Sequence, residues 1–417
     1  MNNLIITNAR IVTPIGHSAR KGKEMSKLLL IERGTIEVKD GIIVYVGEEK
    51  KHLVNEQIKD VRYYDAKGRC LLPGFVDSHT HFVFGGERAK EFSWRLAGES
   101  YMSIMNKGGG IVNTVKATRA MDFDTMYDRA NKLLRRMSRM GITTVEGKSG
   151  YGLDCDTELR QLEVMKKLNE KLDKRVDISA TFLGAHAIPE EYKGNADEYI
   201  DFLIKEMLPL IKRKKLAQFC DVFCEEGVFS VEQSRRLLAA AKEIGFALKI
   251  HADEIVSLGG AELAAELGAI SADHLLHASD AGIKAMAKEN VVATLLPLTA
   301  FALKEQYARG REMIDAGCAV ALATDLNPGS CFSGSIPLTF DLACIYMKLS
   351  IEEAITALTL NGAAAINSAD KIGSVEVGKQ ADFVILDSSD YRYLPYYIGM
   401  NCVGTVVKNG RIYEIEN

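Results

Sequence analysis

The stretch Leu71-Leu72-Pro73-Gly74-Phe75-Val76-Asp77-Ser78-His79-Thr80-His81 decides how this chain is interpreted. An apolar run that leads into two histidines two residues apart is typical of a β-strand with imidazoles at its end. Alternate side chains of a strand share one face, so His79 and His81 should point toward the same place. Two such imidazoles are a natural start to a mononuclear metal site, with bonds of roughly 2.0–2.1 Å to zinc. Two unrelated surface or core histidines are the other interpretation, and the further candidate ligands downstream make it the weaker one.

The middle of the chain repeats one pattern, in which an amphipathic helix ends at a glycine and a short apolar strand follows. Residues 125–140 have helical spacing, Gly141 ends that helix, and a strand is expected directly after it. Ser230 and Gln233 resemble a capping box that opens the next such helix, which ends before Gly245. With the strand before His79, the expected strands are 142–145, 178–183, 219–223, 247–250, 270–272, 291–295 and 319–323.

These strands are predicted to be apolar on both faces, which suits a parallel sheet covered by helices. Eight βα units over roughly 300 residues predict a (β/α)8 barrel, a TIM-like fold whose active site lies at the carboxyl ends of its strands. A doubly wound sheet is the alternative. Such a sheet should carry a glycine-rich phosphate turn after its first strand, where this sequence has His79 and His81 instead.

The two ends of the chain have a different pattern. Residues 3–70 and 373–417 contain short alternating runs with turns such as Asp40-Gly41 and Asn409-Gly410. We expect both ends to build one small β-sandwich beside the barrel, although two separate flanking sheets are the alternative. The predicted division is 1–73 for the N-terminal part of the sandwich, 74–372 for the catalytic barrel and 373–417 for the C-terminal part.

Composition describes an ordinary globular protein. Of the 417 residues, 47% are hydrophobic and 26% are charged, and the net charge of −4 gives no basic surface for nucleic acid. We expect no signal peptide and no membrane contact, because no apolar stretch reaches the ~18 residues of a membrane span. The eight cysteines are scattered without a C-x-x-C pair, which predicts reduced thiols in the cytoplasm.

Histidines gather at the predicted strand ends, where the barrel topology would bring them together. His251, followed by Ala252-Asp253-Glu254, is the expected third metal ligand. Asp325, directly after the last strand, is the expected fourth ligand, although an N-cap of the next helix is its alternative role. Three imidazoles and one carboxylate leave a position for water, as in catalytic metal sites. Six of the eight histidines share this placement: His79, His81, His186, His251, His274 and His277.

Several neighbours could take part in the chemistry. A divalent metal lowers the pKa of its bound water from 15.7 to ~7, and Glu254 and His274 are the candidates for the proton transfers that follow. His277 is a weaker candidate, because Leu275 and Leu276 suggest that it packs at the rim. Arg88 could clamp a carboxylate, unless it is an ordinary solvated arginine. The loop Asn327-Pro328-Gly329-Ser330 would expose backbone N–H groups and a hydroxyl to a substrate.

Taken together, the motifs resemble the imidazolonepropionase family of the amidohydrolase superfamily, an enzyme family of histidine breakdown. The resemblance covers nearly the whole chain and includes the C-terminal stretch 373–382, which is typical of the superfamily's sandwich. The combination of Lys148-Ser149-Gly150-Tyr151-Gly152-Leu153 with His251-Ala252-Asp253-Glu254 and Ala272-Asp273-His274-Leu275-Leu276-His277 is much narrower than the superfamily motifs. Further matching stretches are 73–88, 184–187, 221–225, 258–279 and 324–330.

The resemblance implies hydrolysis of the ring amide of 4-imidazolone-5-propanoate to N-formimidoyl-L-glutamate. It also implies a homodimer and one zinc or iron ion per subunit, and the absence of a lysine from residues 219–225 agrees with a single metal. The implied metal ligands are His79, His81, His251 and Asp325. The implied substrate contacts are Arg88, Tyr151, His186, Glu254, Asn327, Gly329 and Ser330, of which Tyr151 and His186 come from the resemblance alone.

The expected catalytic groups are Glu254, His274 and Asp325, and which of them is the general base stays open. His274 would stabilise or protonate the intermediate, while Glu254 or Asp325 would pass a proton to the leaving nitrogen. The main alternative function is a mononuclear-metal deaminase of a nucleobase-like heterocycle, which a carboxylate-binding Arg88 disfavours. A non-enzymatic scaffold would require missing metal ligands, and all four are present.

Overall fold

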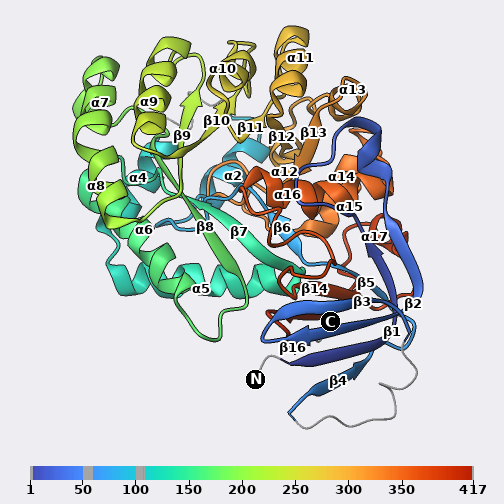
Figure 1. Cartoon of the computed structure of the whole chain (residues 1–417). Coiled ribbons are helices and arrows are strands. Elements are labelled where there is room, and N and C mark those ends of the chain that lie inside the picture. The colour runs from blue at the N-terminus through green and yellow to red at the C-terminus, as the bar shows by residue number, and fades with distance from the viewer. Residues whose placement is uncertain (1–2, 50–59, 100–106, 108, 416–417) are drawn as a thin grey trace.

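The computed structural model describes residues 3–49, 60–99, 107 and 109–415, and these form two eight-stranded sheets (Figure 1). The first sheet is parallel, and its strands follow one another in chain order. These strands are β6 (Phe75–Asp77), β7 (Ile142–Lys148), β8 (Asp177–Ala185), β9 (Phe219–Cys224), β10 (Ala247–Ala252), β11 (Ser271–His274), β12 (Val292–Leu295) and β13 (Ala319–Leu322).

The two edges of this parallel sheet meet just beyond β6 and β13, which closes it into a barrel. Thr80 and Leu326 form an isolated parallel bridge. The N–H of Asp325 donates to the carbonyl of His79 at 3.0 Å, and the N–H of His81 donates to the carbonyl of Leu326 at 2.9 Å. The expected (β/α)8 barrel is therefore confirmed, and the doubly wound alternative is wrong. The closure also ties the histidine pair to the segment that carries Asp325.

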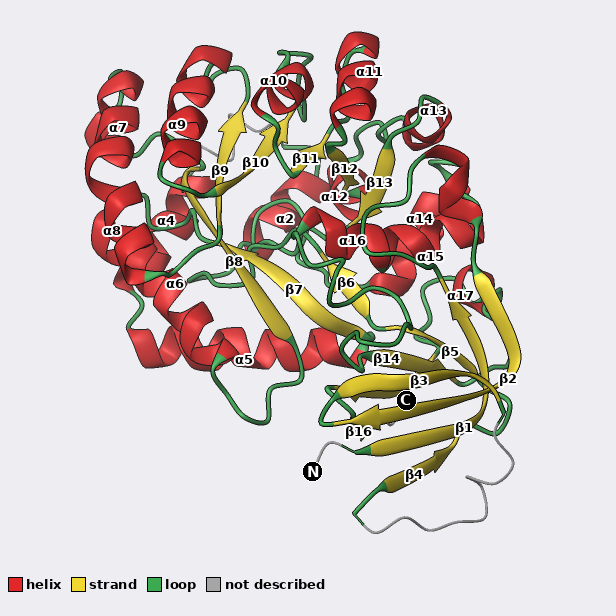
Figure 2. Cartoon of the chain, viewed as in Figure 1, coloured by secondary structure: helices red, strands yellow, loops and turns green. Residues whose placement is uncertain are grey.

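Helices surround the barrel on its outer side (Figure 2). The expected signals operate at their ends: Ser230 and Gln233 form a capping box at α9, and Gly141 and Gly245 follow helices with φ of +88° and +87°. Within the described residues, no helix combines the length and hydrophobicity needed to cross a bilayer. The helices are α2 (Ala89–Leu96), α4 (Ile111–Ala120), α5 (Phe123–Arg139), α6 (Cys155–Asn169), η2 (Glu190–Tyr192), α7 (Ala196–Phe202), η3 (Leu203–Met207), α8 (Leu208–Lys214), α9 (Val231–Glu243), α10 (Gly260–Leu267), α11 (Asp280–Glu289), α12 (Pro297–Leu303), α13 (Gly310–Asp315), α14 (Ile336–Ile345), α15 (Ile351–Leu358) and α16 (Leu360–Ala365).

The second sheet, called the terminal sheet below, is built from both ends of the chain. Its order is β16-β15-β14-β5-β1-β2-β3, with β4 beside β1, and the two halves join where β14 runs antiparallel to β5. The sheet lies to one side of the barrel, with both termini beside it (Figure 1). One shared structure from both ends is thus confirmed over two separate sheets. Its strands are β1 (Leu4–Thr13), β2 (Leu29–Lys39), β3 (Ile42–Glu48), β4 (Arg62–Asp65), β5 (Cys70–Pro73), β14 (Phe383–Leu386), β15 (Val403–Lys408) and β16 (Arg411–Glu414).

The predicted division at 73/74 falls between β5 and β6, but two segments of the chain ends lie against the barrel rather than in the sheet. One is η1 (Gly22–Ser26), whose Met25 is buried in the barrel's apolar cluster. The other is α17 (Tyr393–Tyr396), whose Leu394 joins the same cluster. The limits 1–73, 74–372 and 373–417 therefore stay a prediction.

The barrel interior is not apolar. The expectation that the strands are apolar on both faces is therefore wrong. Several interior side chains are charged and fully buried: Glu146, Lys148, Asp221, Lys249 and Asp273. Each is paired with an opposite charge, which is how buried ionic groups are accommodated. Apolar residues that alternate with these charges, such as Val145, Val222 and Ile250, belong instead to the barrel's apolar cluster.

Candidate active site

Four side chains from separate parts of the barrel converge at the carboxyl ends of its strands. The Nε2 atoms of His79 and His81 lie 3.6 and 3.7 Å from Oδ1 of Asp325. Nε2 of His251 lies 3.4 Å from Nε2 of His81. All four side chains are at most 3% exposed. The residues that the sequence predicted as ligands are thus brought together, while their role toward a metal stays a prediction.

The donor atoms fit a small cation. Ligands at about 2.1 Å around a tetrahedral ion lie about 3.4 Å apart, close to the separations seen here. Nε2 of His79 is buried without a hydrogen-bond partner in the described structure, an arrangement that a metal bond would satisfy. Burial, Lys148 and the neighbouring imidazoles hold the pKa of His79 well below its ordinary value, so the ring is neutral and able to bind a metal.

Asp325 is positioned by both its backbone and its side chain. Its φ of +50° is unusual for a residue other than glycine, and such strain is typical of functional sites. The Thr299 hydroxyl donates to Oδ2 at 2.6 Å, which leaves Oδ1 facing the histidines. Burial raises the pKa of this carboxyl to about 7. A bound cation would reverse that shift by favouring the carboxylate.

Two buried carboxylates lie behind the histidines, and sequence reasoning did not identify them. Oδ2 of Asp273 lies 2.7 Å from Nδ1 of His79. Oδ2 of Asp221 lies 3.0 Å from Nδ1 of His251. The Asp273 carboxylate accepts the Nδ1 proton of His79 and so leaves Nε2 with its lone pair free, which is how such partners orient metal-binding histidines. Asp221 lies against Nδ1 of His251 as a charge pair, outside hydrogen-bond geometry.

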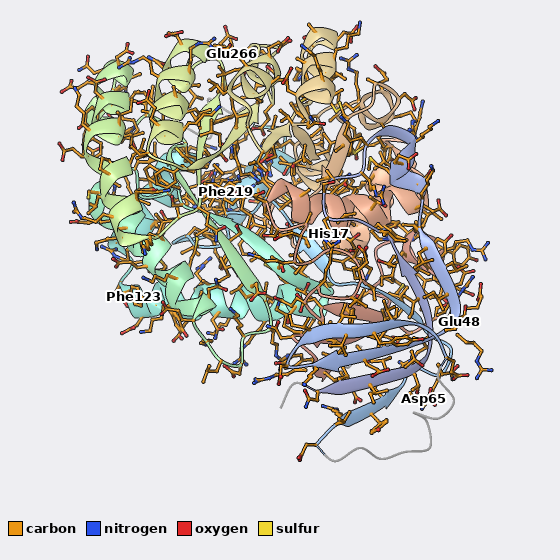
Figure 3. All side chains as sticks on the ribbon, viewed as in Figure 1. His17, Glu48, Asp65, Phe123, Phe219 and Glu266 are labelled. Atoms are coloured by element: carbon orange, nitrogen blue, oxygen red, sulfur yellow. The ribbon has the colours of Figure 1, made fainter. Side chains whose placement is uncertain are left out.

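Two buried lysines complete this layer and were also missed. Nζ of Lys148 lies 2.7 Å from Asp221, and Nζ of Lys249 lies 2.9 Å from Glu146 and 5.8 Å from the ring centre of Phe219. Phe219 is labelled in Figure 3 at the start of β9. The missed signal was the strand period, because Lys249 lies two residues before His251 and must share its inward face.

Glu254 and His274 form a pair beside the ligands. Oε1 of Glu254 lies 3.4 Å from Nδ1 of His274. Burial, together with the charges of Asp325 and Glu225, raises the pKa of Glu254 to about 8, whereas burial lowers that of His274 to about 3. The Glu254 segment is fixed because Glu225 accepts its backbone N–H at 3.0 Å. A carboxyl with a raised pKa beside a neutral imidazole is suited to proton transfer.

One wall of the site is aromatic. The rings of His186 and His81 stack with centroids 4.9 Å apart, and Tyr151 lies 5.1 Å from His186. Nδ1 of His186 lies 2.9 Å from the carbonyl of Gly150, so it must carry the proton and Nε2 is the acceptor. The loop that holds Tyr151 is anchored by the carboxylate of Glu158, which accepts the N–H groups of 150, 152 and 153. Sequence reasoning did not identify Glu158.

Arg88 also lines the site. Its Nε donates to Oε2 of Glu91 at 2.7 Å, which fixes the guanidinium and leaves its terminal nitrogens directed elsewhere. Nη1 lies so close to Gly329 that a Cβ added at that glycine would come within 2.3 Å of it. A glycine is therefore required at this position if the arginine is to keep its place.

The backbone N–H groups of the loop after Asp325 are already hydrogen-bonded within the loop. The expectation that they are free for a substrate is therefore wrong. The N–H groups of Gly329 and Ser330 both donate to Oδ1 of Asn327 at 2.8 Å. The amide nitrogen of Asn327 donates in turn to the carbonyl of Asp325 and to the hydroxyl of Ser330. Asn327 thus organises the loop, because a side-chain amide satisfies the turn. The hydroxyl of Ser330 keeps its own proton to donate.

A cavity of about 460 Å³ joins these walls, a size suited to a small ligand. His79 and His277 are absent from its lining. Nδ1 of His277 lies 3.0 Å from the Gln306 amide. The predicted site residues that line the cavity are His81, Arg88, Tyr151, His186, His251, Glu254, His274, Asp325, Asn327, Gly329 and Ser330.

Comparison with known proteins decides the family. Residues 70–413 match the model of the amidohydrolase family. The chain is 72% identical over 413 residues to the imidazolonepropionase of Bacteroides thetaiotaomicron, covering 99% of each chain. It is 60% identical over 411 residues to that of Clostridium tetani, covering 98% of each. This chain belongs to the imidazolonepropionase family. It is therefore a hydrolase, and the alternative of a non-enzymatic scaffold is wrong.

Solved structures outside the imidazolonepropionase family support the fold. Escherichia coli guanine deaminase superposes with a TM-score of 0.74 at 16% identity, with full coverage of both chains. The 5-methylcytosine deaminase of Klebsiella pneumoniae gives a TM-score of 0.72 at 19% identity, covering 99% of this chain and 98% of the other. Likeness at such low identity shows the shared barrel and terminal sheet alone. It gives no support to the deaminase alternative.

Proposed function

We propose that this chain hydrolyses the ring amide of 4-imidazolone-5-propanoate to N-formimidoyl-L-glutamate, a step of histidine catabolism. The reaction adds one water: the ring C–N bond breaks, the carbonyl carbon gains the hydroxyl, and the nitrogen gains the proton. The observation that carries this proposal is the membership of the imidazolonepropionase family, combined with a cavity that is lined by both Arg88 and the ligand cluster. A heterocycle with a carboxylate tail matches that arrangement.

We propose further that His79, His81, His251 and Asp325 hold one divalent metal ion, either zinc or iron. Imidazole and carboxylate suit both metals, so the donor set does not choose between them. When bound, the ion would acidify a water and polarise the ring carbonyl. The support is the separation of 3.4–3.7 Å between the donor atoms and the unpartnered Nε2 of His79.

The remaining residues of the cavity bind and orient the substrate in this proposal. The terminal nitrogens of Arg88 take the propionate, because a guanidinium fork matches a carboxylate. Tyr151 and His186 form the wall against the ring, and Nε2 of His186 accepts a hydrogen bond from a ring N–H. Asn327 and Gly329 keep the loop and Arg88 in place, and the Ser330 hydroxyl faces the same cavity.

Proton transfer falls to the pair of Glu254 and His274, with Asp325 as the third candidate. Glu254 takes a proton from the attacking water and passes it to the leaving nitrogen, and His274 stabilises the oxygen of the former carbonyl. Their separation of 3.4 Å supports this assignment. The raised pKa of Glu254 suits delivery of a proton to the leaving nitrogen, and a bound cation would favour the carboxylate that takes the proton from water. Glu254→Gln should lower kcat more than it raises KM, and an unchanged kcat would remove Glu254 from this role.

The test of the proposed reaction is to follow loss of the imidazolone chromophore and formation of N-formimidoyl-L-glutamate, with and without a chelator. We expect turnover that the chelator abolishes and that added Zn²⁺ or Fe²⁺ restores. Ammonia release from purines or cytosine, measured in parallel, should be absent. Deaminase activity without imidazolone hydrolysis would overturn the proposal in favour of that alternative.

We also propose a cytoplasmic homodimer. All eight cysteines are free thiols, which agrees with a reducing compartment. For dimerisation, the support is the family resemblance together with exposed apolar side chains such as Tyr346, Tyr396 and Ile398. Light scattering that gives the mass of one chain would overturn the dimer.

A further inference from the structure

Lys148 occupies the centre of the barrel interior, and no step proposed above uses it. Its Nζ lies 2.7 Å from Oδ2 of Asp221, 2.9 Å from Oε1 of Glu146 and 3.4 Å from Oδ2 of Asp273. Neither the lysine nor these three carboxylates have any exposed side-chain surface. Buried ion pairs add little net stability, because desolvation offsets most of their attraction. Stability alone is therefore a weak reason for this cluster.

The carboxylate oxygens that face Lys148 are the same atoms that face two of the proposed metal ligands. Oδ2 of Asp273 lies 2.7 Å from Nδ1 of His79, and Oδ2 of Asp221 lies 3.0 Å from Nδ1 of His251. The ammonium group of Lys148 thus contacts both of the carboxylates that lie against these two imidazoles. Without it, two buried negative charges would repel each other, and the rings that they orient would follow them apart.

We propose that Lys148 is a positioning residue for the metal centre: it fixes Asp221 and Asp273 so that Nε2 of His251 and of His79 point at one cation. This inference rests on the metal centre proposed above. Lys249 does not have the same position, because its Nζ contacts Glu146 and the carbonyls of Ser78 and Ala365 and stays 3.8 Å from Asp273.

The chain offers a matched control in Lys408. This lysine is 1% exposed and also contacts two carboxylates, Asp177 at 2.6 Å and Asp382 at 2.7 Å. Its cluster joins β15 of the terminal sheet to the start of β8, outside the candidate active site. Lys148→Met and Lys408→Met therefore remove equally buried ammonium groups, and only the first is connected to the histidines.

The experiment measures the Zn²⁺ dissociation constant of each metal-free variant by competition with a chromophoric chelator. For Lys148→Met, we expect the Zn²⁺ dissociation constant to rise about 10–100-fold, as for other residues that support metal ligands. At saturating Zn²⁺, kcat should fall while KM stays within about twofold, and the visible spectrum of the Co²⁺ form should change. Lys408→Met should keep the wild-type Zn²⁺ affinity and Co²⁺ spectrum, although both variants lose thermal stability.

A wild-type Zn²⁺ affinity in Lys148→Met would overturn the inference, and so would an equal loss in Lys408→Met, which would indicate general destabilisation. If Lys148→Met does not fold, Lys148→Met/Asp221→Asn removes one cation and one anion together. That double variant should also bind Zn²⁺ at least about tenfold more weakly, and wild-type affinity would again overturn the inference. A wild-type chain that binds no Zn²⁺ would overturn the metal centre itself, a failure distinct from the others.

Discussion

The two sheets of this molecule each have eight strands, but they enclose opposite kinds of interior. The terminal sheet buries an apolar cluster that includes Leu4, Ile6, Ile36 and Phe383. The barrel encloses two lysines, three carboxylates and the candidate ligands. Apolar burial stabilises a fold at roughly 25 cal/mol per Å², whereas buried charge contributes little net stability. The barrel's stability therefore resides outside its strands, against the helices, and its centre is available for chemistry.

If this comparison holds, substitutions in the two sheets should separate activity from stability. The largest effect is expected for His251→Ala. Loss of a metal ligand should lower kcat by about 10³-fold or more, because the ion supplies several kcal/mol of transition-state stabilisation. His251 borders the open cavity, so its truncation leaves no sealed void and the metal-free chain should lose less stability than an apolar core variant does. Turnover near the wild-type rate would contradict the assignment.

The converse variant is Ile36→Ala in the terminal sheet. Ile36 is fully buried and lies opposite Ile6 on the neighbouring strand. Truncation should lower the free energy of unfolding by about 2–4 kcal/mol through the cavity it leaves. Denaturant titration checks this, and kcat and Zn²⁺ affinity measured at low temperature should stay at the wild-type level. A fall in kcat comparable with that of His251→Ala would break the proposed separation between the sheets.

Arg88 belongs to neither interior, and its substitution should affect substrate binding rather than turnover or stability. Arg88→Ala removes the proposed carboxylate clamp, and a charged hydrogen bond is worth about 1.5–3 kcal/mol. We expect KM to rise about 10–100-fold with little change in kcat and none in Zn²⁺ affinity. Glu91→Gln, which leaves the arginine but weakens its anchor at Nε, should raise KM less. An unchanged KM in Arg88→Ala would count against the clamp.

The smallest expected effect is on the stability of the protein at acidic pH. Burial lowers the pKa of His186 to about 4 from an ordinary 6.5, so between these values the unfolded chain binds a proton that the folded chain excludes. The free energy of unfolding is therefore unaffected by this group above pH 6.5 and falls as the pH is lowered toward 4. Glutamine does not titrate, so His186→Gln should escape this loss. The difference in free energy of unfolding between the metal-free wild type and the metal-free variant should therefore shrink by about 1–2 kcal/mol between pH 6.5 and pH 4. A gap independent of pH would contradict the neutral, buried imidazole.

The sequence predicts the barrel well because its signals are local. Gly141 and Gly245 mark helix ends, Ser230 marks a helix start, and polar residues follow each apolar strand. All the expected site residues except His79 and His277 line one cavity, because a barrel places all its strand ends on one side. Tyr151 was found only through the family resemblance, since nothing in its local pattern indicates that it faces a ligand.

What the sequence did not predict depends on contacts between distant strands. Lys148, Asp221 and Asp273 come from β7, β9 and β11, and their mutual pairing exists only once the barrel closes. The sequence analysis therefore overlooked the charged residues within these strands. Side chains two residues apart share one face of a strand, so the inward-facing His251 would have placed Lys249 in the barrel interior as well. The bonding of Asn327 to its own loop was missed for a similar reason, because an exposed turn and a self-satisfied turn have the same sequence.

The most direct test of the central claim is anomalous diffraction at the zinc absorption edge from crystals of the metal-loaded chain. The account predicts a single peak, about 2.0–2.2 Å from Nε2 of His79, His81 and His251 and from Oδ1 of Asp325. A peak held by other side chains, a second metal beside the first, or no peak at this point would contradict it.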